Sequence, residues 1–539
     1  MNSAALECLR DLDPSVYDEC IRLGNHGDSI KNNRWAETMA GEEYARVPSW
    51  GVHGKRKSDY EGVSPCRYAD LPQSLLEPVL VKWATAHGWQ MRFDTRLVEV
   101  IEEKESSSDK KVVARVVDQI TGFEYSVRTR YLFGADGGRS LVAEHIDLPF
   151  TSMPGGAQAY NVLVRADLGH LMRHQEGNIH MLPRLEKDYP FVALARMVKP
   201  WAEWMFVFIG DADITVSILH TSRWQINETS ADVLFRGHVF CLGDAIHRHP
   251  PTLGLGSNTC IQDTFNLSWK IAYVLRSLAS PSLLDTYNTE RQPVASKLVL
   301  DSNNTLRSHI ALWTALGMQP HGSPVSARQA AKEVLNQKSP AGQQARKALR
   351  ERVRHMQTES QALGTAMNQL YVSSAICAAD EESAYQPGPK EQIDPCRYHD
   401  PSTYPGRRLP HVWLGRRIPA KLESTLDVAG KGAFTLLTGI GGDGWRTAAQ
   451  LVQHTLGVEV NVVGIGIGLE YEDVYLDWDE KSGVEEDGCV LVRPDLFVAW
   501  RSKSAGEESL RLLAVMRRVL GVAPIPADEQ EWRWDWARR

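Results

Sequence analysis

Short apolar runs of strand length alternate with longer segments of helical periodicity along this chain of 539 residues. An apolar run at 238–242 is typical of a buried strand, and the amphipathic segment 261–278 is typical of a helix. A helix is also expected at 3–12, and strands are expected at 160–165 and 204–208. This alternation predicts an α/β fold.

The distribution of these patterns predicts three domains, one of them discontinuous. Residues 1–150 alternate helix and strand patterns, whereas 151–235 is rich in strand patterns that suit a sheet covering a substrate. Helical periodicity returns in 301–385, interrupted by prolines, and a Pro-Gly-Pro linker follows near residue 388. The expected domains are a cofactor domain formed by 1–150 together with 236–385, a β-sheet substrate domain at 151–235, and a C-terminal domain at 386–539.

Composition narrows the class of protein without assigning a function. With 43% hydrophobic and 24% charged residues the chain can bury a sizeable core. A net charge of −7 gives no reason to expect nucleic acid or an anionic membrane as partner. The eight cysteines contain no Cys-x-x-Cys pair, and no run of about twenty apolar residues or signal peptide occurs. We therefore expect a cytoplasmic enzyme.

The most informative segment is 243–258, which connects the strand at 238–242 to the helix. Asp244 at the end of the strand can accept hydrogen bonds from ligand hydroxyls, and prolines stiffen the crossing. Gly254 and Gly256 allow close approach of a ligand to the backbone, and the N–H groups near Ser257 favour negative charge at a helix start. The residues that we expect to bind the ligand are Gly243, Asp244, Ala245, Pro251, Gly254, Leu255, Gly256, Ser257 and Asn258.

Two other interpretations of this segment remain. It can be an ordinary strand, turn and helix with a histidine-rich loop. Alternatively, His247 and His249 can be metal ligands, but an isolated His-x-His is weak evidence and no further ligand cluster accompanies it. We therefore expect no metal site.

Two shorter motifs have similar chemistry. In 131–144 a short apolar strand is followed by Asp136, Gly137 and a second glycine, and then by Arg139 at a helix start. Arg139 can instead form a surface salt bridge. In 70–80, Gln73 follows Leu-Pro, where it can either contact a ligand or serve as part of an ordinary polar helix start.

These motifs together resemble those of the FAD-dependent aromatic hydroxylases. Segment 243–258, continued by 261–270 and 284–293, is similar to the second flavin-binding motif of that family, and 131–144 is similar to its Asp-Gly motif. The resemblance implies that FAD contacts Asp244 and Asp136, that Arg139 helps to receive NADPH, and that Gln73 touches the ribityl or phosphate region. The chain looks most similar to phenol and dichlorophenol hydroxylases.

The resemblance also implies a fold. We expect a p-hydroxybenzoate-hydroxylase-like FAD domain, a β-sheet substrate domain, and a thioredoxin-like C-terminal domain indicated by 404–414 and 490–501. The family begins with a strand, a Gly-x-Gly-x-x-Gly turn and a helix, and this unit does not precede 3–12, so the FAD domain is expected to be truncated at its N-terminus. Cys489 lacks a nearby second cysteine, which favours a structural or dimer-contact role for the C-terminal domain.

The function implied is hydroxylation of a phenolic or polyketide-derived aromatic, in catabolism or secondary-metabolite biosynthesis. NADPH would reduce FAD, and reduced FAD with O2 would transfer one oxygen atom to the ring. Relatives are often homodimers. The alternative is a catalytically silent remnant, or an incomplete gene model, that does not retain FAD and acts at most as a binding partner. The catalytic residue is unknown from the sequence, and Trp224 is either a substrate-side aromatic or a core residue.

Overall fold

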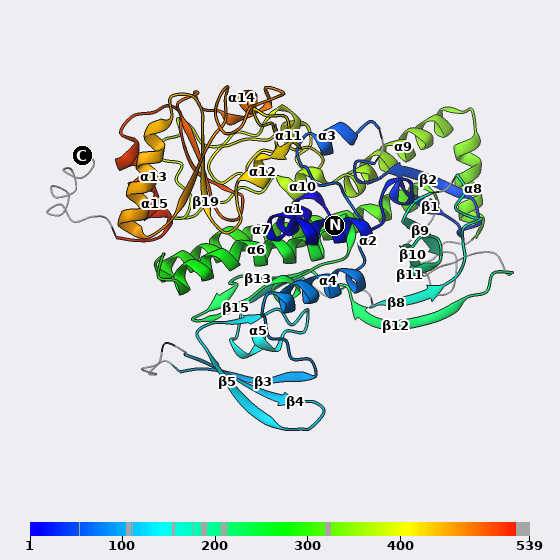
Figure 1. Cartoon of the computed structure of the whole chain (residues 1–539). Coiled ribbons are helices and arrows are strands. Elements are labelled where there is room, and N and C mark those ends of the chain that lie inside the picture. The colour runs from blue at the N-terminus through cyan, green and yellow to red at the C-terminus, as the bar shows by residue number, and fades with distance from the viewer. Residues whose placement is uncertain are drawn as a thin grey trace.

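The computed structural model describes residues 1–52, 54–103, 109, 111–153, 156, 158–174, 176–184, 191–205, 213–317 and 325–523. Two long helices, α6 (Gly256–Leu275) and α7 (Asp285–Ala315), cross the middle of the molecule (Figure 1). The C-terminal domain lies on one side of them, and a large sheet with helices α8 (Val325–Asn336) and α9 (Pro340–Ser360) lies towards one end (Figure 1).

The chain begins with two helices that share a capping residue. The Asn2 side chain accepts a hydrogen bond from Ala5 N at the start of α1 (Ser3–Leu12), which confirms the helix expected at 3–12. Asp13 ends α1 and caps α2 (Pro14–Leu23), which has proline at its first position. Nearly every side chain of α1 is buried, because α1 packs between α6 and the C-terminal domain.

A three-stranded sheet carries the two motif strands. Its order is β14 (Phe235–Arg236), β15 (Val239–Cys241) and β6 (Leu132–Gly134), and β15 runs parallel to β6 with Val239 opposite Leu132. Phe240 is fully buried here and stacks on Phe235 with ring centroids 4.6 Å apart. The strand expected at 238–242 and the helix expected at 261–278 are confirmed as β15 and α6.

A seven-stranded sheet forms the second unit, and its neighbour order is β12-β8-β11-β10-β9-β1-β2. β1 pairs with β9 in parallel, whereas the other neighbours are antiparallel. The strand expected at 160–165 is confirmed within β8, but the one expected at 204–208 is described only to residue 205, and the rest lies outside the described residues. The strands are β1 (Asn32–Ala36), β2 (Glu43–Pro48), β8 (Gln158–Arg165), β9 (Ile179–Arg184), β10 (Phe191–Lys199), β11 (Glu203–Met205) and β12 (Ser217–Gln225).

Two smaller sheets complete this part of the molecule. One is the antiparallel hairpin series β3-β4-β5, which projects from the rest (Figure 1). The other has the order β16-β13-β7. Their strands, with the remaining helices of this half, are β3 (Thr95–Glu102), β4 (Val112–Asp118), β5 (Glu124–Thr129), β7 (Phe150–Ser152), β13 (Thr229–Ala231), β16 (His247–Arg248), α3 (Lys57–Glu61), α4 (Gln73–Ala86), α5 (Leu141–His145) and α10 (Leu363–Met367).

The C-terminal domain has a four-stranded sheet of order β20-β19-β21-β22. β19 and β20 are parallel, and β21 and β22 follow as antiparallel neighbours. Trp445 and Trp500 fill its core, which is continuous with Trp269 and Tyr273 of α6. Its elements are β17 (Trp413–Leu414), β18 (Glu423–Ser424), β19 (Phe434–Thr438), β20 (Val460–Gly464), β21 (Cys489–Val492), β22 (Val498–Ser502), α11 (Pro389–Ile393), α12 (Thr425–Val428), α13 (Asp443–Leu456), α14 (Asp477–Ser482) and α15 (Glu508–Val519).

Among the described residues, no helix has both the length and the apolar character needed to cross a membrane.

Candidate active site

The two acidic motifs lie at the same edge of one sheet. β6 and β15 are parallel neighbours, so the turns that follow them, which carry Asp136 and Asp244, meet at that edge. Gly243 has a φ of 62°, and a Cβ there would lie 2.9 Å from Cys260 Sγ, so both conformation and space require glycine. The structure thus brings together two motifs that are far apart in the sequence.

Asp244 is exposed at this edge. Its only side-chain hydrogen bond among the described residues is with the Cys260 thiol, whose sulfur lies 3.7 Å from Oδ1. Most of its hydrogen-bonding capacity is therefore free for a ligand. Ala245 beside it is buried in the core under the turn.

Asp136 has a different environment. One carboxylate oxygen accepts a hydrogen bond from Ser140 Oγ at 2.6 Å, and the other accepts from the backbone N–H groups of Leu141 and Val142. The side chain thus holds the start of α5. Gly137 adopts a φ of 80°, and Arg139 is exposed with no ion pair among the described residues.

Arg248 is a residue that the sequence interpretation missed. Its Nε donates to the carbonyl oxygen of Asp244 at 3.3 Å, and its Cδ lies 3.7 Å from the position of a Cβ on Gly138. The side chain therefore bridges the two motifs. Sequence offered no signal for this role, because the bridge depends on how the two turns approach each other.

The loop before α6 has the conformation expected for close approach of a ligand. Leu253 and Gly254 adopt φ values of 63° and 62°, and a Cβ on Gly254 would meet no atom within 4 Å. Asn258 holds the loop from inside the helix: its Nδ2 donates to Gly254 O at 2.6 Å, and its Oδ1 accepts from Asn2 N at 2.9 Å. Pro251 is exposed at the start of this turn.

The start of α6 is not capped. It begins at Gly256 after Leu255, and no side chain forms a cap. The N–H groups of Gly256, Ser257 and Asn258 have no acceptor among the described residues. Such a helix end favours a negatively charged or carbonyl oxygen.

A buried carboxylate supports the turn from below. Asp263 on α6 accepts hydrogen bonds from Gly243 N at 3.2 Å, from the His247 ring at 2.9 Å and from Arg291 Nε at 2.8 Å. Burial alone would raise the pKa of Asp263, but Arg291 and His247 hold it below its usual range. One ring nitrogen of His247 is therefore used in the hydrogen bond to Asp263.

The neighbouring His249 is partly buried. Burial lowers the pKa of His249 to about 4, so its ring is neutral at pH 7. Its ring centroid lies 6.2 Å from that of His247. Among the described residues, no group of three or more His, Cys, Asp or Glu side chains is placed to hold a metal ion.

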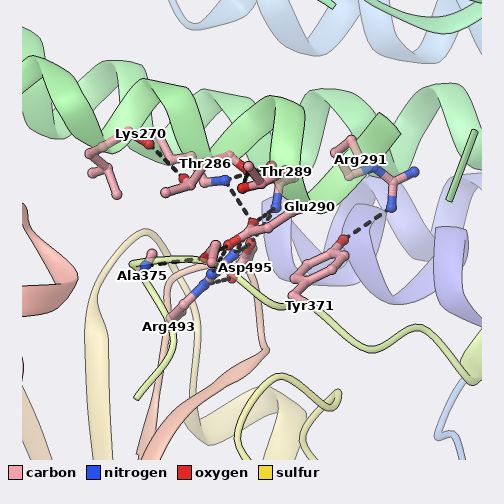
Figure 2. A network of polar contacts seen from close by, with 12 residues as sticks. Lys270, Thr286, Thr289, Glu290, Arg291, Tyr371, Ala375, Arg493 and Asp495 are labelled. Carbon is pink, nitrogen blue, oxygen red and sulfur yellow. Dashed lines mark hydrogen bonds and ion pairs between the residues drawn. The ribbon is translucent and has the colours of Figure 1, made fainter. Parts of the chain in front are cut away.

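A charged cluster joins this region to the C-terminal domain, and Figure 2 shows Arg493 and Asp495 of that domain reaching Glu290 on α7. Arg493 donates to both Glu290 oxygens at 2.6 and 2.9 Å and to both Asp495 oxygens, and Lys270 Nζ lies 2.7 Å from Glu290. Beside it, Tyr371 Oη accepts from Arg291 at 3.0 Å (Figure 2). Burial would raise the pKa of Glu290, but Arg493 and Lys270 hold it well below its usual range.

An apolar pocket lies against the loop. The space within it that no atom fills is about 360 Å³, including the part open to solvent, although the centre of a water molecule can occupy only about 20 Å³ of it. Trp50 and Tyr68 stack in its wall with centroids 4.8 Å apart. It is lined by Asn2, Ser3, Trp50, Tyr60, Tyr68, Leu253, Gly254, Leu255, Ala362, Leu363 and Ala366.

Two candidates from the sequence do not line this pocket. Gln73 is the first residue of α4, and its side chain donates to Glu77 at 2.6 Å. Trp224 lies on β12, where its indole donates to Asn161 at 3.1 Å. Trp224 is half-buried on a strand that is otherwise exposed, so it is neither a core residue nor part of this pocket.

The C-terminal domain contains a glycine pattern that the sequence interpretation overlooked. Gly439, Gly441 and Gly444 form Gly-x-Gly-x-x-Gly between β19 and α13, and β20 then returns parallel to β19. A Cβ on Gly444 would lie 3.1 Å from the carboxyl carbon of Glu508, and one on Gly439 would lie 2.5 Å from the Glu486 carbonyl oxygen. Acidic and carbonyl groups thus fill the space that a dinucleotide phosphate needs.

The residues present fit the flavin end of FAD. The uncapped N–H groups of α6, the open space at Gly254 and the exposed Asp244 carboxylate suit a conjugated ring with a polyhydroxyl chain. For the adenine end, the described residues contain no strand other than β15 paired with β6, and no glycine fingerprint next to it.

Parallel strands that end on acidic turns, an uncapped helix beside an apolar pocket, and a covering sheet together define the fold of a class A flavoprotein monooxygenase. The family comparisons agree: residues 1–302 match the FAD binding domain family, and residues 402–523 match the family described as aromatic-ring hydroxylase, C-terminal. The chain therefore belongs to the FAD-dependent aromatic-ring hydroxylases.

Individual relatives cover nearly the whole chain. It is 37% identical to 2,4-dichlorophenol 6-monooxygenase of Delftia acidovorans, over 97% of this chain and 91% of that protein. It is 38% identical to phenol 2-monooxygenase of Pseudomonas sp. (strain EST1001), over 93% of this chain and 83% of that protein. Among solved structures, the flavin-dependent monooxygenase PieE in complex with FAD and substrate matches with a TM-score of 0.90 and 34% identity, covering 97% of this chain and 92% of that one.

These findings confirm the family and the enzyme class expected from the sequence: the protein is an FAD-dependent aromatic monooxygenase. The truncation of the FAD domain, the domain boundaries and the roles of the individual site residues stay predictions.

Proposed function

We propose that the enzyme hydroxylates a phenolic ring held in the apolar pocket, with NADPH as the reductant. The observation that carries this proposal is the position of an aromatic-lined pocket directly against the loop 253–255, next to the uncapped start of α6. The names of the relatives support the substrate class, since two of them act on phenol or 2,4-dichlorophenol.

We propose a single ring as substrate, rather than a polycyclic one, because the pocket is narrow. Its space of about 360 Å³ includes the part open to solvent, so the side chains of its wall must move even to admit a single ring. Other relatives include aklavinone 12-hydroxylase RdmE of Streptomyces purpurascens, at 29% identity. A polycyclic substrate would require the wall formed by Leu253, Leu363 and Trp50 to move apart.

FAD, when bound, would supply the redox chemistry by accepting a hydride from NADPH and by activating O2 once reduced. The N–H groups of Gly256, Ser257 and Asn258 would stabilise negative charge on the ring system. Asp244 would accept hydrogen bonds from the ribityl hydroxyls. Leu253 and Leu255 would exclude water from the reacting atoms.

The Asp-Gly motif would contribute at the same edge. Asp136 uses both carboxylate oxygens to hold α5, so its role would be to fix the shape of the turn that contains Gly137. Arg139 is an exposed cation without an ion pair among the described residues, which supports a role in receiving NADPH. Gln73 would be a peripheral contact to the ribityl or phosphate region.

The C-terminal domain would be a thioredoxin-like unit without thiol chemistry. The strand order β20-β19-β21-β22, with α13 and α15 packed together, supports this assignment. Cys489 is buried, and burial raises the pKa of its thiol, which disfavours the reactive thiolate. Formation of a homodimer is a further part of the proposal, supported by exposed Ile218 and Tyr160 on the paired strands β12 and β8.

The test is an absorption spectrum of the purified protein after incubation with FAD and desalting. Retained flavin bands that bleach on addition of NADPH, faster with 2,4-dichlorophenol present, are the expected result. The variant Asp244→Ala should lose flavin with little loss of stability, because the only side-chain hydrogen bond of this exposed carboxylate among the described residues is with the Cys260 thiol. A folded but colourless wild-type protein would instead support the silent remnant.

A further inference from the structure

Tyr60 lines the pocket, and its buried hydroxyl has no hydrogen-bond partner among the described residues. The residue lies on the short helix α3 and lines the pocket. Its Oη is shielded from solvent and has no partner among the described residues. A buried hydroxyl without a partner is destabilising, and most such groups in proteins are satisfied. The hydroxyl therefore points to a ligand that supplies the missing partner.

The ring of Tyr60 is held firmly in place. It packs over Gly51, where a Cβ would lie 2.4 Å from Tyr60 Cγ. It also packs against the apolar cluster that contains Leu253, Leu255 and Leu363. The hydroxyl is thus positioned by contacts on both sides, one of which is the loop that precedes α6.

We propose that the Tyr60 hydroxyl donates a hydrogen bond to the oxygen of the phenolic substrate and so orients the ring beside the loop 253–255. This inference rests on the proposed function. Burial raises the pKa of Tyr60, so the hydroxyl stays protonated and acts as a donor at neutral pH. A donor at this place also stabilises the substrate oxygen as negative charge develops on it during hydroxylation.

Among the described residues that line the pocket, the other buried side-chain polar atom without a partner is Asn2 Nδ2. Its Oδ1 caps α1 by accepting from Ala5 N, and its backbone N–H donates to Asn258. Through these two contacts Asn2 stabilises the starts of α1 and α6. The Tyr60 hydroxyl makes no structural hydrogen bond among the described residues, and we therefore assign it the recognition of the substrate oxygen.

The test compares two probes that differ only in the hydroxyl group, 2,4-dichlorophenol and 1,3-dichlorobenzene. Each is titrated into the FAD-loaded protein by calorimetry. We expect the wild type to bind the phenol about ten- to a hundredfold more tightly, since a buried donor is left unpaired by the analogue. Tyr60→Phe should bind the two probes within about threefold of each other and should bind 1,3-dichlorobenzene no more weakly than the wild type does.

Tyr273→Phe is the matched control. This tyrosine is also buried, but it lies near the far end of α6, about 25 Å from Gly256 along the helix, and it donates to the Gly432 carbonyl oxygen at 3.3 Å. It should keep the wild-type preference. A Tyr60→Phe variant that still prefers the phenol tenfold would overturn the inference and leave the proposed function intact. If the wild type binds neither probe, both proposals fall.

Discussion

Arg493 is the residue on which the attachment of the C-terminal domain depends, and Arg493→Met tests this directly. Its guanidinium donates twice to Glu290 and twice to Asp495, at distances from 2.5 to 2.9 Å. The side chains of all three are essentially inaccessible to solvent, at 0 to 1%. No solvent screening therefore weakens these interactions.

The magnitude follows from what the substitution leaves behind. Glu290 keeps Lys270, Asn266 and Ser373 as donors, but among the described residues the only side-chain donor left to Asp495 is Asn266, at 3.1 Å. The cluster changes from neutral to a net charge of −1 in a buried site. Removing one partner of a buried ion pair costs about 3–5 kcal/mol. Because the free energy of unfolding of a domain is only about 5–15 kcal/mol, Arg493→Met should remove a large part of the stability of the C-terminal domain.

The assay is thermal and urea denaturation, followed by circular dichroism. We expect the midpoint of thermal unfolding of the C-terminal domain to be about 6–20 °C lower in Arg493→Met than in the wild type. The double variant Arg493→Met/Asp495→Leu should regain part of the lost stability. It leaves the ion pair of Lys270 and Glu290, whose charges sum to zero. As a control on the same domain, Arg446→Met removes an ion pair with Glu470 that is 40–46% exposed, and it should cost less than about 1 kcal/mol.

Two results would refute this reasoning. One is a loss below about 1 kcal/mol in Arg493→Met, which would mean that the cluster contributes no more than an exposed pair. The other is a double variant less stable than the single one. Either would show that the stranded charge of Asp495 is not the source of the destabilisation.

Three further predictions concern the loop, its support and pH. Gly254→Ala and Gly432→Ala place a Cβ in equally open space at positive φ, so each should cost about 1 kcal/mol of stability, but only Gly254→Ala should weaken FAD retention in the desalting assay. Asp263→Asn should lower the free energy of unfolding by about 3 kcal/mol in denaturation experiments, and it should also lower FAD retention. The reason is that Arg291 loses its carboxylate partner and Gly243 N loses its acceptor. Unchanged FAD retention would contradict the role of Asp263 in supporting the turn. Burial lowers the pKa of His180 to about 3 and that of His411 to about 4, below the unfolded value of about 6.5. Between those values the unfolded state binds more protons at these two histidines, so their contribution to the unfolding free energy should fall as the pH drops from about 6.5 towards 4; His411→Asn should reduce the slope.

The sequence determined the local elements around the candidate flavin site. The strand β15, the turn at Gly243 and the helix α6 follow from an apolar run, a glycine and proline segment and an amphipathic periodicity, all of which act over a few neighbouring residues. The same local signals, through the resemblance that they carry, also identified the family. These features need no knowledge of distant contacts.

Tertiary structure decided the pocket and its support. Trp50, Tyr60, Leu253 and Leu363 come from separate segments, so no local pattern marks them as one wall. Arg493 lies 203 residues from Glu290, and neither residue's neighbours in sequence indicate the pairing.

Packing also decided whether a ligand can reach a glycine motif. The pattern Gly439-x-Gly441-x-x-Gly444 has the local order of a dinucleotide loop, but Glu508, from another helix, occupies the space beside it. Conversely, the uncapped start of α6 became a candidate site because Asn258 is used elsewhere, in holding Gly254 and Asn2. Spacing within the chain specifies backbone conformation, whereas the access of a ligand to that backbone depends on which distant side chains fill the remaining space.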